Sequence, residues 1–204
     1  MACRTIILFF ILLLGISQTA FALNILCLGD SLTEGYGVGK AEAWPALVEA
    51  NLKAKRLDIT LNNAGISGST SASAQSRLTW HFKSKVKFDW MILALGANDG
   101  LRGQSTKNIK NNLANAIDTA RKAGVKKVIL TGIQVPPNYG SKYASEVSKI
   151  FPDLAKEMNV PLIPFLLDGV AGKPELNLPD GIHPNAKGHK IIAEKITKFI
   201  ESQL

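Results

Sequence analysis

The sequence predicts an α/β fold of three layers, in which a central parallel sheet of about five strands lies between two layers of helices. Short apolar runs alternate with longer amphipathic segments along the chain after residue 22. Strands separated by helices of this length imply right-handed crossovers, which produce a parallel sheet covered on both faces. Polar, glycine-rich turns follow the first three apolar runs, as expected at the edge where parallel strands end and binding sites form.

The predicted elements follow one another in a regular order. An apolar run at 25–28 predicts the first strand, and a helical pattern follows it at 43–55. A strand at 58–62 and a helix at 72–83 repeat this unit. Later strands are expected at 90–95, 128–131 and 162–164, and later helices at 106–123, 142–158 and 186–202. Since no Ser/Gly-rich linker, charge block or repeat divides the chain, one domain is expected over 23–204.

The first residues have the pattern of an export signal. Arg4 precedes an uncharged apolar stretch at 6–16, and the A-x-A sequence at 20–22 is a site for signal peptidase. We expect cleavage after Ala22, which makes 1–22 a signal peptide and the mature protein periplasmic or secreted. A retained membrane anchor is disfavoured, because about eleven apolar residues are too few to cross roughly 30 Å of hydrocarbon.

The cysteine content and the net charge limit the kinds of site and partner that this chain can have. Cys27 alone remains after cleavage, which excludes an internal disulfide and offers no thiol cluster for a metal. A lipid anchor on Cys27 is disfavoured because Leu26, a large residue, precedes it. The formal net charge of +8 comes from single lysines without interleaved aromatic residues, such as Lys53, Lys55, Lys107, Lys110 and Lys190. This indicates a solvated surface and no nucleic-acid partner, and leaves open a transient contact with anionic membrane surfaces.

A serine follows the first predicted strand, within Gly29-Asp30-Ser31-Leu32. Ser31 therefore lies where a buried strand gives way to a turn, a natural place for a nucleophile. The alternative role is that of a helix N-cap, which is common for serine after a strand. The two roles are compatible, because backbone N–H groups and the positive end of the helix dipole would lie near a developing oxyanion.

A matching acid and base occur near the C-terminus. Asp180 and His183 are three positions apart, in a loop just before the last predicted helix. We expect Asp180 to accept the Nδ1–H of the imidazole, which leaves Nε2 to take the proton of Ser31. Pro184 restricts His183 to extended backbone geometry. The alternatives are a core histidine and a plain turn aspartate, but a serine with these two partners predicts a hydrolase.

Two further residues are candidates for an oxyanion hole. Asn98 lies in the turn after the third predicted strand, where its side-chain amide is a donor, although a turn alone would also explain it. Gly65 permits either a positive φ or the close approach of a substrate carbonyl to a backbone N–H. The N–H groups of Ser31 and Gly65 and the Asn98 amide together predict a hole with three donors.

Four blocks in this order resemble the Ser/Gly/Asn/His signature of the SGNH, or GDSL, hydrolases. They are Gly29-Asp30-Ser31-Leu32, Asn63-Ala64-Gly65-Ile66-Ser67-Gly68, Gly96-Ala97-Asn98-Asp99 and Asp180-Gly181-Ile182-His183. The resemblance covers essentially the whole mature chain, and it is greatest to the bacterial periplasmic multifunctional acyl-CoA thioesterase, lysophospholipase and arylesterase group. It implies a flavodoxin-like SGNH hydrolase fold that uses no metal or cofactor.

The resemblance also implies a role for each matched residue. Ser31 is the nucleophile, Asp180 and His183 complete the triad, and Gly65 and Asn98 complete the oxyanion hole with the Ser31 N–H. The implied enzyme is a serine hydrolase that cleaves ester or thioester bonds of acyl substrates, lysophospholipids included, through an acyl-enzyme. One departure is Ser69-Thr70, where that group often has Asp-Thr, and it leaves the preferred acyl chain length open.

Apolar residues near the predicted loops are candidates for an acyl groove, although each is explained equally well as core: Ile66, Leu101, Val135, Pro136, Tyr139 and Ile182. Two other functions stay open. A carbohydrate O-deacetylase shares the fold and triad but requires an aromatic-lined cleft, which the positions of the three tryptophans do not suggest. A non-catalytic acyl-binding module would not need a serine with a base and a matched carboxylate.

Overall fold

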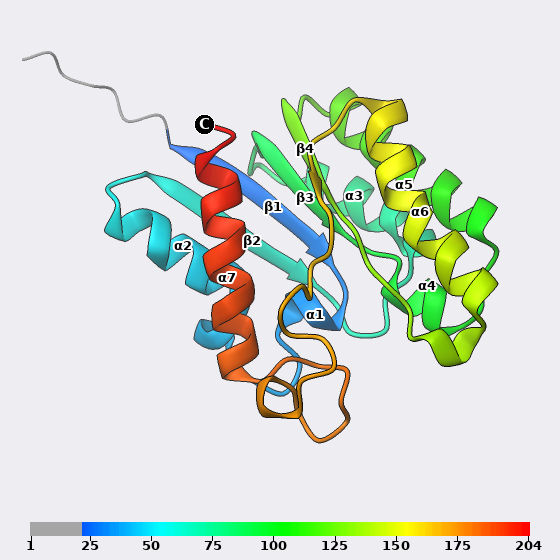
Figure 1. Ribbon diagram of the computed structural model, residues 1–204. Coiled ribbons are helices and arrows are strands. Elements are labelled where there is room, and N and C mark those ends of the chain that lie inside the picture. The colour runs from blue at the N-terminus through cyan, green and yellow to red at the C-terminus, as the bar shows by residue number, and fades with distance from the viewer. Residues whose placement is uncertain (1–21) are drawn as a thin grey trace, which may run out of the picture.

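A five-stranded parallel sheet forms the centre of the structure (Figure 1). The computed structural model describes residues 22–204. The spatial order of the strands is β2-β1-β3-β4-β5. Their bounds are β1 Leu23–Gly29, β2 Ile59–Gly65, β3 Trp90–Ala94, β4 Lys127–Thr131 and β5 Leu162–Ile163. The predicted three-layer α/β fold is confirmed, and each predicted strand is present.

Helices cover both faces of this sheet. The five longer ones are α2 Trp44–Ala54, α3 Ala74–Phe82, α5 Thr106–Lys122, α6 Ser141–Met158 and α7 Ala186–Glu201. Figure 1 shows α2 and α7 on one face and α3, α5 and α6 on the other. All five agree with the predicted helices to within two residues at each end.

Shorter helical segments lie in the loops. Two are α-helices, α1 Ser31–Glu34 after β1 and α4 Ala97–Leu101 after β3. Four are 3₁₀ turns at Lys40–Glu42, Ser71–Ser73, Pro137–Tyr139 and Pro174–Leu176. The sequence pattern did not predict α1 or α4, because segments of four and five residues are too short to display a helical period.

Two hydrophobic cores explain why the strands are apolar without interruption. Ile25 and Cys27 of β1 belong to the core under α2 and α7, whereas Leu26 and Leu28 belong to the core under α3, α5 and α6. Successive side chains of a strand point to opposite faces, so a strand covered on both faces is apolar throughout. Burial raises the pKa of the Cys27 thiol, so this residue fills a core position as an uncharged side chain.

The carboxyl ends of β1, β2 and β3 lie side by side. Gly29 at the end of β1 pairs with Gly65 of β2 and with Ala94 of β3. β2 continues beyond its predicted end and includes Asn63 and Ala64, because its pairing with β1 extends to the last residue of both strands. From β1 and β3 the chain crosses over in opposite directions, and doubly wound sheets bind ligands at such a point. The turns after these strands meet at one edge, as predicted.

The predicted export signal, residues 1–22, lies outside the described residues except for Ala22. The first strand begins at the next residue, Leu23. Within residues 22–204, no helix has both the length and the apolar character needed to cross a bilayer.

Candidate active site

Ser31 is the first residue of α1, directly after β1. The N-cap of this helix is Asp30, whose Oδ1 accepts the N–H of Leu32 at 3.0 Å, so the N-cap role considered for Ser31 is wrong. The Ser31 hydroxyl instead lies 3.0 Å from Nε2 of His183. Ser31 is 8% exposed, and its accessible side faces a cavity.

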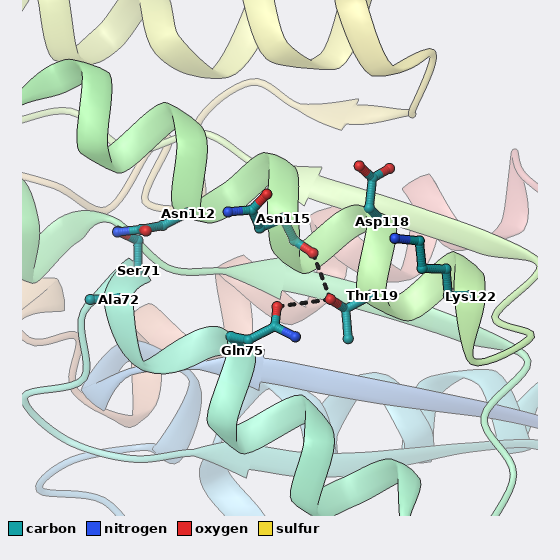
Figure 2. Close-up of a pocket in the computed structure, with 8 residues that line it drawn as sticks. All are labelled: Ser71, Ala72, Gln75, Asn112, Asn115, Asp118, Thr119 and Lys122. Carbon is teal, nitrogen blue, oxygen red and sulfur yellow. Dashed lines mark hydrogen bonds between the residues drawn. The ribbon is translucent and has the colours of Figure 1, made fainter.

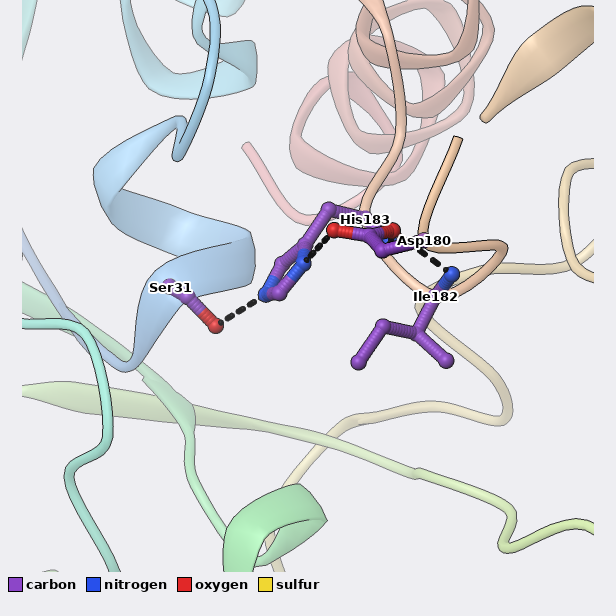
Figure 3. Close-up of polar contacts among 4 residues, drawn as sticks. All are labelled: Ser31, Asp180, Ile182 and His183. Atoms are coloured by element: carbon purple, nitrogen blue, oxygen red, sulfur yellow. Dashed lines mark hydrogen bonds and ion pairs between the residues drawn. The ribbon is translucent and has the colours of Figure 1, made fainter. Parts of the chain in front are cut away.

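His183 lies between the serine hydroxyl and a carboxylate (Figure 3). Its Nδ1 is 2.7 Å from Oδ2 of Asp180, while Oδ1 of the same carboxylate accepts the backbone N–H groups of Ile182 and His183, both at 3.0 Å. Partial burial raises the pKa of Asp180, but the hydrogen bonds from His183 and Ile182 outweigh it and lower the pKa to about 2. The ionised carboxylate only accepts, so Nδ1 carries the imidazole proton and Nε2 is the acceptor for Ser31.

Two asparagines hold the loop that carries His183. Asn177 is buried, and its side-chain amide donates to two backbone carbonyls of the preceding loop at 2.9 and 2.8 Å. Asn185 is the N-cap of α7, and its amide donates to the Asn177 carbonyl at 3.2 Å. The His183 carbonyl accepts the N–H of Leu178 at 2.7 Å. Sequence reasoning missed both residues, although Asn185 directly before a helical pattern is a recognisable N-cap signal.

Asn98 is the second residue of α4, and it lines the same cavity as Ser31. Its side-chain amide donates to the Ser69 carbonyl at 3.0 Å and lies 3.4 Å from the Asp30 carboxylate. The next residue, Asp99, is buried and accepts hydrogen bonds from the N–H and hydroxyl of Ser71 at 2.8 and 2.6 Å. The segment expected as a turn is therefore a short helix, and its hydrogen bonds join the loop after β2 to Asp30, the residue before Ser31.

Gly65 is not placed as the sequence suggested. It is the last residue of β2, does not line the cavity beside Ser31, and donates its N–H to Oδ1 of Asn63 at 2.9 Å. A Cβ at this position would lie 2.1 Å from the backbone N of Glu34 in α1. The absence of a side chain is explained by the close packing of α1 on β2, and neither a positive φ nor an approaching substrate is needed.

The glycine that follows in the same motif has a different environment. Gly68 has φ of +77°, in a loop where the Ser69 N–H donates to the Ile66 carbonyl at 3.1 Å. Glu34 ties this loop to α1 by accepting the Ser67 N–H at 2.7 Å. Because the Ser69 carbonyl receives the Asn98 amide, the peptide groups around Gly68 are close to the site, and sequence reasoning missed this residue.

Asp30 has a buried carboxylate that contacts both α1 and the Asn98 side chain. Burial raises its pKa to about 6, although backbone N–H groups, the charge of Arg77 and the charge that His183 has when protonated act against the increase. Arg77 donates to the carbonyls of Gly29, at 2.8 Å, and Ala64, and so binds the ends of β1 and β2 together. Asp30 thus helps to hold both α1 and Asn98, a role that the sequence did not reveal.

A cavity of about 270 Å³ lies beside Ser31. Ser31, His183 and Asn98 line it together. Apolar residues form most of its wall: Leu32, Ala97, Leu101, Pro136, Phe165, Leu167, Ala171 and Ile182. An apolar group in this cavity would be removed from water, which stabilises binding by about 0.8 kcal/mol for each buried CH₂ group.

Three of the residues predicted for an acyl groove line this cavity, namely Leu101, Pro136 and Ile182. Val135 does not line it. It is 7% exposed and packs against Gly100 in the core under α5 and α6, so its assignment to the groove was wrong. An apolar residue beside a glycine-rich turn has no sequence feature that separates core from groove.

Ile66 and Tyr139 also lie outside the cavity lining, and both are exposed. The wall contains instead Phe165, Leu167 and Ala171 from the loop after β5. Sequence reasoning missed these three, because the apolar pattern does not reveal that this loop folds back beside Ser31.

A second hollow, of about 340 Å³, lies between α3 and α5 (Figure 2). Its lining is polar, and the Thr119 hydroxyl lies 2.8 Å from both Oε1 of Gln75 and the carbonyl of Asn115. None of its lining residues belongs to the predicted triad or oxyanion hole. Over residues 22–204, no group of three or more His, Cys, Asp or Glu side chains is arranged to hold a metal ion.

Several known proteins are similar in sequence to this chain. The model of the GDSL-like lipase/acylhydrolase family matches residues 27–191. An arylesterase from Vibrio mimicus is 37% identical over 181 residues, which cover 89% of this chain and 90% of that protein. Thioesterase 1/protease 1/lysophospholipase L1 of Escherichia coli K12 is 36% identical over 193 residues, 95% of this chain and 90% of that protein.

A solved structure agrees with these sequence matches. The psychrotrophic esterase EstA from Pseudoalteromonas sp., in a structure inhibited by monoethylphosphonate, has a TM-score of 0.84 and 34% identity to this chain. The match covers 88% of this chain and 97% of that one.

Proposed function

Because this chain belongs to the GDSL-like lipase/acylhydrolase family, as its motifs predicted, we propose that Ser31 is the nucleophile of its reaction. The protein is an SGNH ester hydrolase that acts on small-molecule esters. One observation carries the assignment of the residues: the Ser31 hydroxyl, the His183 imidazole and the Asp180 carboxylate are hydrogen-bonded in sequence beside a mainly apolar cavity.

The first step transfers the acyl group to the enzyme. His183 Nε2 accepts the proton of the Ser31 hydroxyl as Oγ attacks the carbonyl carbon of the ester or thioester. Asp180, ionised at neutral pH, keeps the Nδ1 proton and stabilises the imidazolium. His183 then gives its Nε2 proton to the departing alcohol or thiol, and the acyl-enzyme on Ser31 remains.

Negative charge on the carbonyl oxygen needs donors that are already in place. The Ser31 N–H and the Asn98 amide, the donors suggested by the sequence, are two of those that we propose. For the third we replace Gly65 by Gly68, because the Gly65 N–H is bound to Asn63, whereas the loop of Gly68 contacts Asn98. Such donors act where charge develops, and each typically contributes on the order of 3 kcal/mol to transition-state stabilisation.

The second step releases the acid. Neutral His183 takes a proton from a water molecule, which attacks the acyl carbonyl, and Ser31 recovers its proton as the acid departs. The same acyl-enzyme transfers its acyl group to an alcohol where an alcohol replaces the water.

The substrates we propose are esters, thioesters and lysophospholipids with medium or long acyl chains. Support comes from the apolar wall of the cavity beside Ser31. The proteins similar to this chain include an arylesterase and a thioesterase 1/protease 1/lysophospholipase L1, whose names cover esters, thioesters and lysophospholipids. A sugar O-deacetylase, the alternative, has no need for an apolar cavity of this kind.

Hydrolysis of p-nitrophenyl esters from acetate to palmitate, by the mature protein and by Ser31→Ala, tests this proposal. We expect serine-dependent turnover with a maximum at medium or long chains, because added CH₂ groups bind in the apolar cavity. Activity confined to acetate would favour the deacetylase. Equal rates for the two proteins at equal folded concentration would refute the role of Ser31.

The cellular location of the protein is also a proposal. We propose that residues 1–22 direct export and are removed near Ala22, so that the domain at 23–204 works in the periplasm or outside the cell. The basic character of the chain, whose net charge is +8 over all 204 residues, supports a transient contact with anionic lipid surfaces, where lysophospholipids are found. The mass of the protein recovered from the host's extracytoplasmic fraction measures the cleavage site directly.

A further inference from the structure

An aromatic ring lies against the imidazole of His183. The ring centroids of Tyr36 and His183 are 4.6 Å apart, and the two planes are inclined by 42°. The Tyr36 N–H donates to the carbonyl of Ser31 at 3.1 Å, so the turn that ends α1 fixes this ring relative to the nucleophile. Tyr36 is 51% exposed, and neither of the two hydrophobic cores includes it.

We propose that Tyr36 is a positioning residue that acts through His183. The inference rests on the proposed function, since it takes His183 as the base that removes the Ser31 proton. The Asp180 carboxylate holds the imidazole through Nδ1, which is a single atom of the ring. The tyrosine ring, packed on the imidazole, limits its tilting and so keeps Nε2 directed at the serine hydroxyl.

The same contact has an electrostatic effect during the reaction. When His183 takes the serine proton, its ring becomes an imidazolium, and the electron-rich face of an aromatic ring attracts a cation at this distance. The contact is stronger in the transition state than in the ground state, which is the condition for accelerating the chemical step. The other charged or titratable groups that act on His183 are Asp180, Asp30 on the turn before α1, and His189 of α7.

Two substitutions of Tyr36 distinguish the effect of the aromatic ring from the effect of side-chain size. Tyr36→Phe keeps the aromatic face, and Tyr36→Leu keeps an apolar cover without it. We expect Phe to retain kcat within about twofold, and Leu to lose about tenfold in kcat with KM changed less than twofold. The acid limb of kcat/KM is expected at lower pH in Tyr36→Leu, because the imidazolium loses stabilisation.

The matched control is Trp80→Leu. Trp80 is an exposed aromatic residue of α3 that lies outside the cavity lining, and its loss is expected to leave kcat and the pH profile unchanged. Thermal unfolding of all variants is measured alongside the kinetics. Since Tyr36 is half-exposed, we expect Tyr36→Leu to unfold within a few degrees of the parent protein.

His183→Ala distinguishes failure of this inference from failure of the proposed function. If His183→Ala keeps full activity, the proposed base is wrong. If His183→Ala is inactive while Tyr36→Leu has the parent kcat and pH profile, only the role of Tyr36 is wrong. A raised KM with unchanged kcat in Tyr36→Leu would also overturn the inference, since it indicates contact with the substrate. An unchanged residual rate when Tyr36→Leu is added to His183→Ala supports action through His183.

Discussion

At the scale of single residues, the site contains two carboxylates whose surroundings shift their pKa values in opposite directions. Asp180 receives hydrogen bonds from His183 and Ile182, and its pKa is lowered to about 2. Burial raises the pKa of Asp30 to about 6. Hydrogen bonding favours the charged form and desolvation disfavours it. Asp180 is therefore the carboxylate suited to stabilise an imidazolium, whereas Asp30 is suited to hold α1 and Asn98 in place.

Asn98→Ala tests the role proposed for Asn98 as an oxyanion donor. We expect kcat to fall about 100-fold, because a donor of this kind typically contributes about 3 kcal/mol to transition-state stabilisation. Thermal unfolding should change little, since the Asn98 side chain is only partly buried and makes a single hydrogen bond shorter than 3.4 Å. Steady-state kinetics and a melting curve on the same sample measure both quantities. A loss of stability with unchanged kcat would remove Asn98 from the reaction.

The sequence motif predicted which side chains come together at the site. It did not predict the roles that depend on the backbone conformation. Ser31, Asp180 and His183 are brought together by the fold as the sequence predicted. The motif contains two glycines three positions apart, Gly65 and Gly68, and their identity does not reveal which N–H is already bound. That difference depends on where β2 ends, which is a property of strand pairing.

At the scale of elements, the site depends on the packing of α1 against the end of β2. Gly65 allows this contact, because any side chain there would overlap the α1 backbone at Glu34. From α3, the Arg77 guanidinium donates to the carbonyls of Gly29, the last residue of β1, and Ala64, the residue before the last in β2. The four residues of α1 are thus held by their contact with β2, since so short a helix has little stability alone.

Gly65→Ala tests this packing. We expect the free energy of unfolding to fall by about 2 kcal/mol or more, because the added Cβ must displace backbone. Gly124→Ala is the matched control: Gly124 has φ of +93° and open space around it, so only conformational strain of about 1 kcal/mol is expected. Urea unfolding compares the two. Equal losses, or a smaller loss for Gly65→Ala, would contradict the close packing.

The long elements were predictable because burial on both faces of a parallel sheet leaves a clear apolar pattern. The runs of β1 and β3 are of this kind, and the helices α5 and α7 carry an apolar stripe of core residues. The loop of Phe165 to Ala171 was not predictable as part of the cavity. Its apolar residues satisfy the core pattern equally well, and only the tertiary structure separates the two roles.

At the scale of the whole molecule, the site joins Ser31 to His183 across 152 positions of the chain. The parallel sheet achieves this, because α7 packs on α2 and the loop before α7 reaches the end of β1 (Figure 1). His189 of α7 is part of this packing, and its Nδ1 accepts the N–H of Trp44, the first residue of α2, at 3.2 Å. Burial lowers the pKa of His189 from 6.5 to about 4.

This histidine makes the stability of the fold depend on pH. Between pH 6.5 and 4 the unfolded chain binds a proton at His189 that the folded protein does not, so stability is lost as the pH falls through this range. The expected loss is about 3 kcal/mol. Asp30 acts in the opposite direction, because its folded-state pKa is raised from 3.8 to about 6 and the folded state gains a proton first.

Comparing the parent protein with His189→Gln separates the effect of His189 on the pH dependence of stability from the opposite effect of Asp30. The free energy of unfolding of the parent protein is expected to fall more steeply than that of the variant between pH 6.5 and 4, whatever their difference at pH 7. Urea unfolding at several pH values measures both slopes. Parallel curves would mean that His189 does not carry this dependence.

The central claim is that Ser31 forms the covalent intermediate, and a phosphonate ester tests it most directly. With a p-nitrophenyl alkylphosphonate, Oγ bonds to phosphorus and p-nitrophenolate leaves, so a stable adduct remains on the nucleophile. Mass spectrometry of the digested protein locates the adduct. The account predicts one adduct per molecule, on Ser31, with none on Ser31→Ala and much slower labelling of His183→Ala. An adduct on another residue, or full labelling of Ser31→Ala, would contradict it.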